Sequence, residues 1–133
     1  MNDYQKSSKT RNTILWIAQI LLAAFFIIGA VMKFMPIEKI SVIMPWTGQV
    51  PVQIVRILGI IDLLAAAGLV LPPIFKIKSE LTSWAAIGIV LMMICAVIFH
   101  VLRGEASVIG INLFCIVLAC LVAWGRFRKG RIG

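Results

Sequence analysis

Charged residues are scarce in this sequence. Lysine, arginine, aspartate and glutamate together make up 14% of the 133 residues, whereas a soluble domain carries about 25%. Histidine occurs once and cysteine three times, and no two cysteines have the Cys-x-x-Cys spacing. No metal-ligand cluster, phosphate-binding glycine loop or lipidation motif is visible. The sequence therefore predicts no metal site and no cofactor motif of its own, and its composition argues against a water-soluble monomer.

Long apolar runs dominate instead, since 62% of the residues are hydrophobic and the mean hydropathy is +1.06. About 20 apolar residues suffice for a helix to cross roughly 30 Å of hydrocarbon. Four runs have this length, and Arg56 and Asp62 are their only charged residues: Ile14–Met32, Val52–Leu71, Leu81–Leu102 and Ala106–Trp124. We therefore predict an all-α integral membrane protein, an antiparallel four-helix bundle. Residues 1–133 would form one domain, with spans at about 13–33, 51–71, 80–102 and 106–125.

The net charge of +8 is distributed unevenly between the two sides of this predicted bundle. One side carries only Lys33, Lys39 and Arg103, and the other carries nine basic residues: Lys6, Lys9, Arg11, Lys76, Lys78, Arg126, Arg128, Lys129 and Arg131. Basic residues concentrate on the cytoplasmic side of membrane proteins. The asymmetry predicts a multi-pass protein of the bacterial inner membrane, with cytoplasmic tails at 1–12 and 126–133. Because the charge is explained by topology, we expect no nucleic-acid partner.

The helices and their connections follow from local signals. The first helix should begin near Asn12 or Thr13. It should turn one stripe of small and polar side chains toward the bundle, namely Gln19, Ala23, Phe26, Ala30 and Lys33. Its remaining apolar residues suit lipid: Ile14, Leu15, Leu21, Leu22, Ile27 and Ile28. Between the first two spans, Pro36 can open and Pro45 must end a short interfacial helix anchored by Trp46. Pro72 and Pro73 should end the second span.

Six polar side chains are expected in the outer half of the bundle: Lys33, Gln53, Arg56, Asp62, His100 and Asn112. Ionisable groups within a span are costly, so they are paired or face a cavity. In one interpretation the residues join the helices, and Arg56 and Asp62 compensate each other. In a second, they line a polar cavity for a small molecule or a quinone head group, with Asp62 and His100 exchanging protons. A surface for another membrane subunit is the third.

Several segments resemble the DoxX-like family of small four-span bacterial membrane proteins. The resemblance covers about residues 15–127, and Asp62 departs from it, because family members more often carry glutamate there. The matching segments are Ala30–Phe34, Met44-Pro45, Arg56–Leu63, Gly68–Pro72, Phe99-His100, Arg103–Glu105, Asn112 and Trp124–Phe127.

The resemblance implies a fold more firmly than an activity. Founding members are associated with a thiosulfate:quinone oxidoreductase and others with oxidative-stress enzyme complexes, while a eukaryotic branch resembles an assembly chaperone for ligand-gated channels. It implies an accessory or small-ligand-binding subunit, with quinone or lipid as candidate ligand and a redox subunit or a second copy as candidate partner. The alternative is an assembly protein without chemistry of its own. An autonomous enzyme ranks third, because catalysis would depend on one histidine and one aspartate alone.

The predicted topology can be tested by cysteine labelling in intact cells. A cysteine at Ser7 or Gly130 should resist a membrane-impermeant thiol reagent, because both termini are expected in the cytoplasm. A cysteine at Thr47, in the outer connection, should react. Labelling at either terminus would contradict the assignment.

Overall fold

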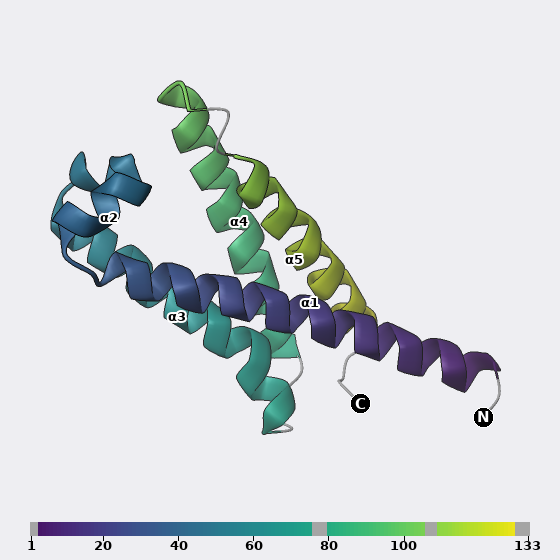
Figure 1. Ribbon diagram of the computed structural model, residues 1–133. Helices are drawn as coiled ribbons and strands as arrows, with labels where there is room; N and C mark the ends of the chain where they lie inside the picture. Colours follow the sequence, from purple (N-terminus) through teal and green to yellow (C-terminus); the bar gives the residue numbers. More distant parts are fainter. Residues whose placement is uncertain (1–2, 76–79, 106–108, 130–133) are drawn as a thin grey trace.

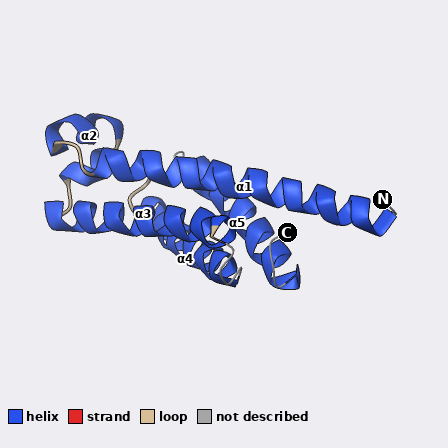
Figure 2. Ribbon diagram, turned by 90° about the horizontal axis from the view of Figure 1, so that it is seen from below, coloured by secondary structure: helices blue, strands red, loops and turns tan. Residues whose placement is uncertain are grey.

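The computed structural model describes residues 3–75, 80–105 and 109–129, and these residues are almost entirely helical. All side chains discussed below belong to these ranges. Figure 2 shows helices joined by short loops, without strands in the described part of the chain. In chain order the elements are α1 (Asp3–Lys33), α2 (Ile37–Ile43), the 3₁₀ turn η1 (Pro45–Gly48), α3 (Val52–Ile74), α4 (Glu80–Leu102) and α5 (Gly110–Lys129).

The four long helices form two antiparallel pairs. α1 packs along α3, and α4 packs along α5, while α1 also contacts α5 and α3 also contacts α4. Figure 1 shows that the two pairs cross each other and that both termini lie on the same side of the molecule. We call this side the terminal end, and the opposite side, where α2 joins α1 to α3, the loop end. The predicted all-helical fold with a short helix between the first two spans is confirmed.

Three helices are long and apolar enough to cross a membrane: Lys9–Lys33 within α1, and the whole of α3 and α4. α5 contains a shorter apolar segment, Gly110–Arg126. At 1.5 Å per residue its 17 residues extend about 26 Å. The predicted fourth span begins at residues 106–108, which lie outside the described residues, so a fourth crossing stays a prediction.

Two helix ends differ from the sequence-based expectation. α1 begins at Asp3 rather than near Thr13, because no helix breaker separates the polar N-terminal residues from the apolar run. Thr13 is therefore no cap, and its hydroxyl donates to the carbonyl of Lys9 one turn earlier. α3 also runs through Pro72 and Pro73 and ends at Ile74, since a proline near a helix end removes a hydrogen bond without forcing the chain out of the helix.

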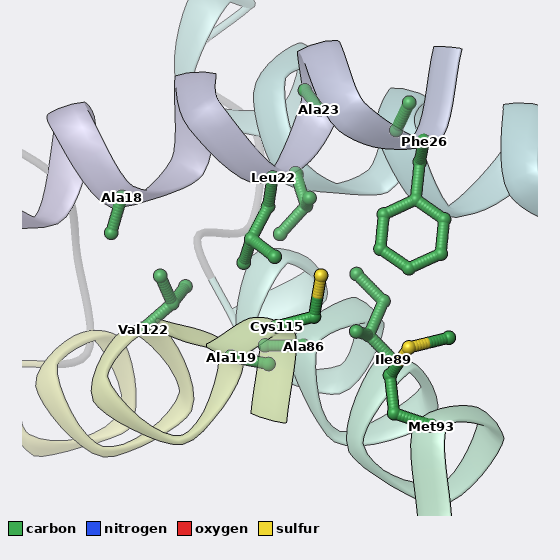
Figure 3. Close-up of a cluster of buried hydrophobic side chains, with 12 residues drawn as sticks. Ala18, Leu22, Ala23, Phe26, Ala86, Ile89, Met93, Cys115, Ala119 and Val122 are labelled. Carbon is green, nitrogen blue, oxygen red and sulfur yellow. The ribbon is translucent and has the colours of Figure 1, made fainter. Parts of the chain in front are cut away.

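The core lies where the two helix pairs cross. Figure 3 shows side chains of α1 pointing toward α4 and α5, with Leu22 and Phe26 facing Cys115, Ile89 and Met93. The predicted inward stripe of α1 is confirmed for its buried members Gln19, Ala23, Phe26 and Ala30.

The outward assignment of Leu15 and Leu22 is wrong, since both are buried. α1 packs on α5 as well as on α3, so its buried face is wider than one stripe. The other four residues assigned to lipid are exposed, as expected: Ile14, Leu21, Ile27 and Ile28.

The connection at the loop end is folded back onto the bundle. α2 begins after Pro36 and buries Ile40, and Pro45 then opens η1 instead of only ending α2. Thr47 is buried and its hydroxyl donates to the carbonyl of Met44 at 2.7 Å. Thr47 is therefore a poor labelling position, and the exposed Lys39 of α2 is the better outer reporter for the topology test.

Two glycines give a matched test of the packing between α3 and α4. A Cβ atom at Gly68 would lie 2.8 Å from the Cβ of Ala85, whereas a Cβ at Gly88 meets nothing within 4 Å. Gly68→Ala should therefore destabilise the protein by about 1–3 kcal/mol through overpacking. Gly88→Ala should leave stability unchanged or raise it by up to about 1 kcal/mol through helix propensity.

Unfolding in mixed micelles with increasing SDS measures the stability of both variants relative to the wild type. Equal stability of the two variants would contradict the close approach of α3 to α4.

Candidate functional site

The polar group at the loop end starts from the end of α1. Pro36 carries no N–H, and a proline keeps the preceding residue out of the helical conformation, so α1 stops at Lys33. The carbonyls of Val31 and Met32 accept from the N–H groups of Phe34 and Met35, whereas that of Lys33 lies past the last helical N–H. Arg56 supplies a donor from α3, because its Nη1 donates to the carbonyl of Lys33 at 2.6 Å and to that of Met35 at 2.7 Å. Arg56 is thus a cap for α1 and joins it to α3.

Asp62, near the middle of α3, forms an ion pair with Lys33. The Lys33 Nζ donates to Oδ2 of Asp62 at 2.6 Å, and the exposed fractions of the two side chains are 15% and 5%. The interpretation in which Arg56 compensates Asp62 is not what the structure shows. Arg56 lies about 9 Å from Asp62 along the helix axis and is committed to carbonyls, whereas Lys33 reaches across from α1.

Two glycines shape the surroundings of this pair. A Cβ at Gly59 would lie 3.0 Å from the Phe34 ring and 3.1 Å from the Cβ of Lys33, so a larger residue there would push the end of α1 and Phe34 a few tenths of an ångström away from α3. A Cβ at Gly29 would lie 3.4 Å from Oδ2 of Asp62 and 3.5 Å from Nζ of Lys33. That is ordinary contact distance, so the pair has room for one methyl-sized group over Gly29.

His100 belongs to a second group at the end of α4. Its Nδ1 lies 2.9 Å from Oε1 of Glu105, and Arg103 donates to both Glu105 oxygens at 3.0 and 3.2 Å. Gly104, with φ of 75°, makes the left-handed turn that brings Glu105 back to them.

The same end of α4 contacts the 3₁₀ turn. Arg103 also donates to Gln49 just after η1, and its guanidinium lies 5.3 Å above the Phe99 ring. The Trp46 ring meets the Phe99 ring edge-on with centroids 6.0 Å apart. These contacts connect η1 to α4 across the loop end.

Glu105 lies in the connection between α4 and α5. The hydrogen bond from Arg103, followed in importance by the one with His100, holds the pKa of the Glu105 carboxyl below its usual value. Glu105 therefore stays ionised at neutral pH, and the stability that it contributes is lost only as the pH falls through this lowered pKa.

The six predicted residues thus separate into different environments. Lys33, Arg56 and Asp62 lie together at the α1–α3 contact, and His100 lies with Glu105. Gln53 is exposed in the first turn of α3, and Asn112 is buried on α5. Among the described residues no group of three or more His, Cys, Asp or Glu could hold a metal ion.

Sequence reasoning missed a buried polar group at the terminal end. In a regular helix the carbonyl of Leu69 would accept from the N–H four residues on, but that residue is Pro73. Gln19 of α1 fills the place, since its Nε2 donates to this carbonyl at 2.7 Å. Gln19 in turn accepts a 2.7 Å bond from Nε of Arg126. The signal for Gln19 was available, because a proline four residues after a buried carbonyl requires an outside donor.

Comparison with models of protein families shows which family the chain belongs to. The DoxX-like family model matches residues 17–122. The chain belongs to the DoxX-like family. The match covers α1 from Ile17, all of α2, α3 and α4, and most of α5, so it includes both polar groups at the loop end. Searches of curated proteins and of solved structures find no match.

The pairing of Asp62 with Lys33 predicts how substitutions of the charged residues in this DoxX-like protein combine in their effect on stability. Lys33→Gln and Asp62→Asn should each destabilise by about 3 kcal/mol, because each leaves an uncompensated, largely buried charge. The double variant should recover much of this loss. Arg56→Gln combined with Asp62→Asn should be additive within about 0.5 kcal/mol.

Double-mutant cycles, with free energies of unfolding measured by SDS in mixed micelles, give the coupling of Asp62 to Lys33 and its coupling to Arg56. Strong coupling of Asp62 to Arg56, with none to Lys33, would refute the pairing.

Proposed function

We propose that this DoxX-like protein is an accessory subunit of a membrane oxidoreductase complex and binds a small amphipathic ligand of the quinone type. The ligand would lie at the loop end, beside Lys33 and Asp62. The observation that carries the proposal is this ion pair. It is formed between spans, is partly exposed on its Lys33 side, and has room for one methyl-sized group over Gly29.

The chemistry of Lys33 suits a carbonyl ligand. An ammonium group has three N–H donors, and Lys33 directs one of them to Asp62. A quinone carbonyl is an acceptor that a second N–H of Lys33 can reach from the Gly29 side. The exposed Phe34 ring and the apolar helix surfaces nearby offer contact to the rest of such a ligand.

The proposal assigns no catalytic step to the chain. Asp62 is held by Lys33, Arg56 by the end of α1, and His100 by Glu105. Electron transfer would therefore belong to a redox partner subunit, and this chain would position the ligand. We also propose the bacterial inner membrane as its location, with both termini cytoplasmic, because of the nine-to-three distribution of basic residues.

A second candidate is an assembly protein that binds other spans without a small ligand. It is favoured by the surface, where large apolar side chains are exposed along every long helix, including Ile28, Leu64, Leu91 and Val117. Lipid covers such a surface in a monomer, and spans of another protein or of a second copy would cover it in a complex.

Binding of decylubiquinone to the purified protein tests the proposed ligand. Its addition should raise the melting temperature of the wild type in mild detergent, and native mass spectrometry should detect one bound molecule. Gly29→Ala places a methyl group over the ion pair at contact distance and should weaken binding about tenfold. That corresponds to about 1.4 kcal/mol. Gly88→Ala, on α4 with nothing near its Cβ, is the matched control and should bind like the wild type.

Equal binding by the wild type and Gly29→Ala would place the ligand elsewhere. Absence of binding at saturating decylubiquinone would refute the quinone proposal. A stoichiometric protein subunit in the same spectra, without quinone, would favour the assembly function.

A further inference from the structure

A second polar site lies at the terminal end, away from the proposed quinone site. It is centred on Arg126 in the last turns of α5, whose exposed fraction is 2%. Its Nε donates to Gln19 at 2.7 Å and its Nη1 donates to Oδ1 of Asn12 at 2.7 Å. Its Nη2 is buried and has no hydrogen-bond partner in the part of the chain that the structure describes.

Among the described residues, no carboxylate forms an ion pair with Arg126. Its two polar partners, Asn12 and Gln19, are neutral amides. A buried cation without a paired anion and with an unused donor is costly. Gln19 and Asn12 fix the guanidinium, so its remaining donor is free for an anion from outside the described residues, and the side chains that cover Nη2 would have to move aside for that anion.

The depth of Arg126 in a membrane is indicated by tryptophan. Its guanidinium lies 6.0 Å from the Trp16 ring centroid. Trp84, near the start of α4, and Trp124, near the end of α5, are both exposed at the terminal end. Exposed tryptophans collect at the level of the lipid headgroups. An anion that is abundant at this level is the phosphate of a phospholipid.

The terminal end is also strongly basic, which favours an acidic lipid. Lys6 and Lys9 of α1 are exposed there and line an open hollow of about 460 Å³ together with Thr10, Thr13 and Ile14. These lysines attract anions in general, without the fixed geometry of Arg126. They therefore provide a matched control for a specific site.

We propose that Arg126 binds a phosphate group at the terminal end, supplied by an acidic phospholipid, with Gln19 and Asn12 as positioning residues. The phosphate oxygen accepts from Nη2 and neutralises the guanidinium. The acyl chains lie against the exposed apolar side of α1. The proposal does not depend on the quinone site, because it involves the opposite end of the bundle.

Native mass spectrometry in mild detergent tests the site with dioleoylphosphatidylglycerol and, as a lipid that lacks phosphate, dioleoylglycerol. The wild type should retain one phosphatidylglycerol at least tenfold better than dioleoylglycerol. Arg126→Gln should lose this preference, and Arg126→Lys should keep only part of it, because lysine lacks the planar fork. Lys6→Gln removes one charge at the same end and should keep the preference within about threefold.

The source of the phosphate is distinguished by sodium phosphate added to delipidated protein at constant ionic strength. A rise in melting temperature equal to that given by phosphatidylglycerol would identify free phosphate as the ligand, and no rise would identify the lipid. Equal retention of both lipids by the wild type would overturn the proposal. So would equal losses of phosphatidylglycerol in Lys6→Gln and Arg126→Gln. If Arg126→Gln fails to fold, the comparison of lipids on the wild type and on Arg126→Lys still decides.

Discussion

The structure depends on the need to satisfy every backbone carbonyl in a medium without water. In hydrocarbon an unsatisfied carbonyl costs several kcal/mol, and a proline inside a helix frees the carbonyl four residues before it. α1 ends before Pro36 and leaves the Lys33 carbonyl that Arg56 caps, and Pro73 frees the Leu69 carbonyl that Gln19 occupies. Both donors come from a neighbouring helix. The prolines thus connect α1 and α3 at both ends of their contact.

This requirement separates the polar residues by role. Arg56 is held at the end of α1, so Lys33 is the cation that remains for Asp62. The Lys33–Asp62 pair in turn requires a close approach of the two helices, which Gly59 permits. On the α4 side, Gly104 returns the chain so that Glu105 can pair with His100 and Arg103. Lys33 and Asp62 at the α1–α3 contact, and Arg103 and Glu105 at the end of α4, therefore each have a charged partner.

The fold could be predicted from the sequence because apolar runs long enough to cross a membrane are recognised without knowledge of any tertiary contact. The inward stripe of α1 followed from helical periodicity, and Leu15 and Leu22 were misassigned because a pattern on one helix does not show how many neighbours that helix has. The proximity of Lys33, Arg56 and Asp62 could also be predicted, because the topology places all three at a similar depth in the membrane. The choice of partner for Asp62 could not, because it depends on where α1 stops and on which carbonyls Arg56 must cap. Arg126 was missed because it appeared to belong to a polar tail, whereas α5 continues to Lys129.

The two ends of the bundle differ in their charge balance, and this difference determines which ligands each can hold. At the loop end Asp62 neutralises Lys33 and Glu105 neutralises Arg103, so the ligand proposed beside Lys33 is best neutral and needs only a hydrogen-bond acceptor. At the terminal end the two hydrogen-bond partners of Arg126 among the described residues are neutral amides, so the ligand proposed there carries the negative charge. A neutral acceptor such as a quinone and an anion such as a lipid phosphate are therefore not interchangeable between the sites. Binding at one end does not compete with binding at the other.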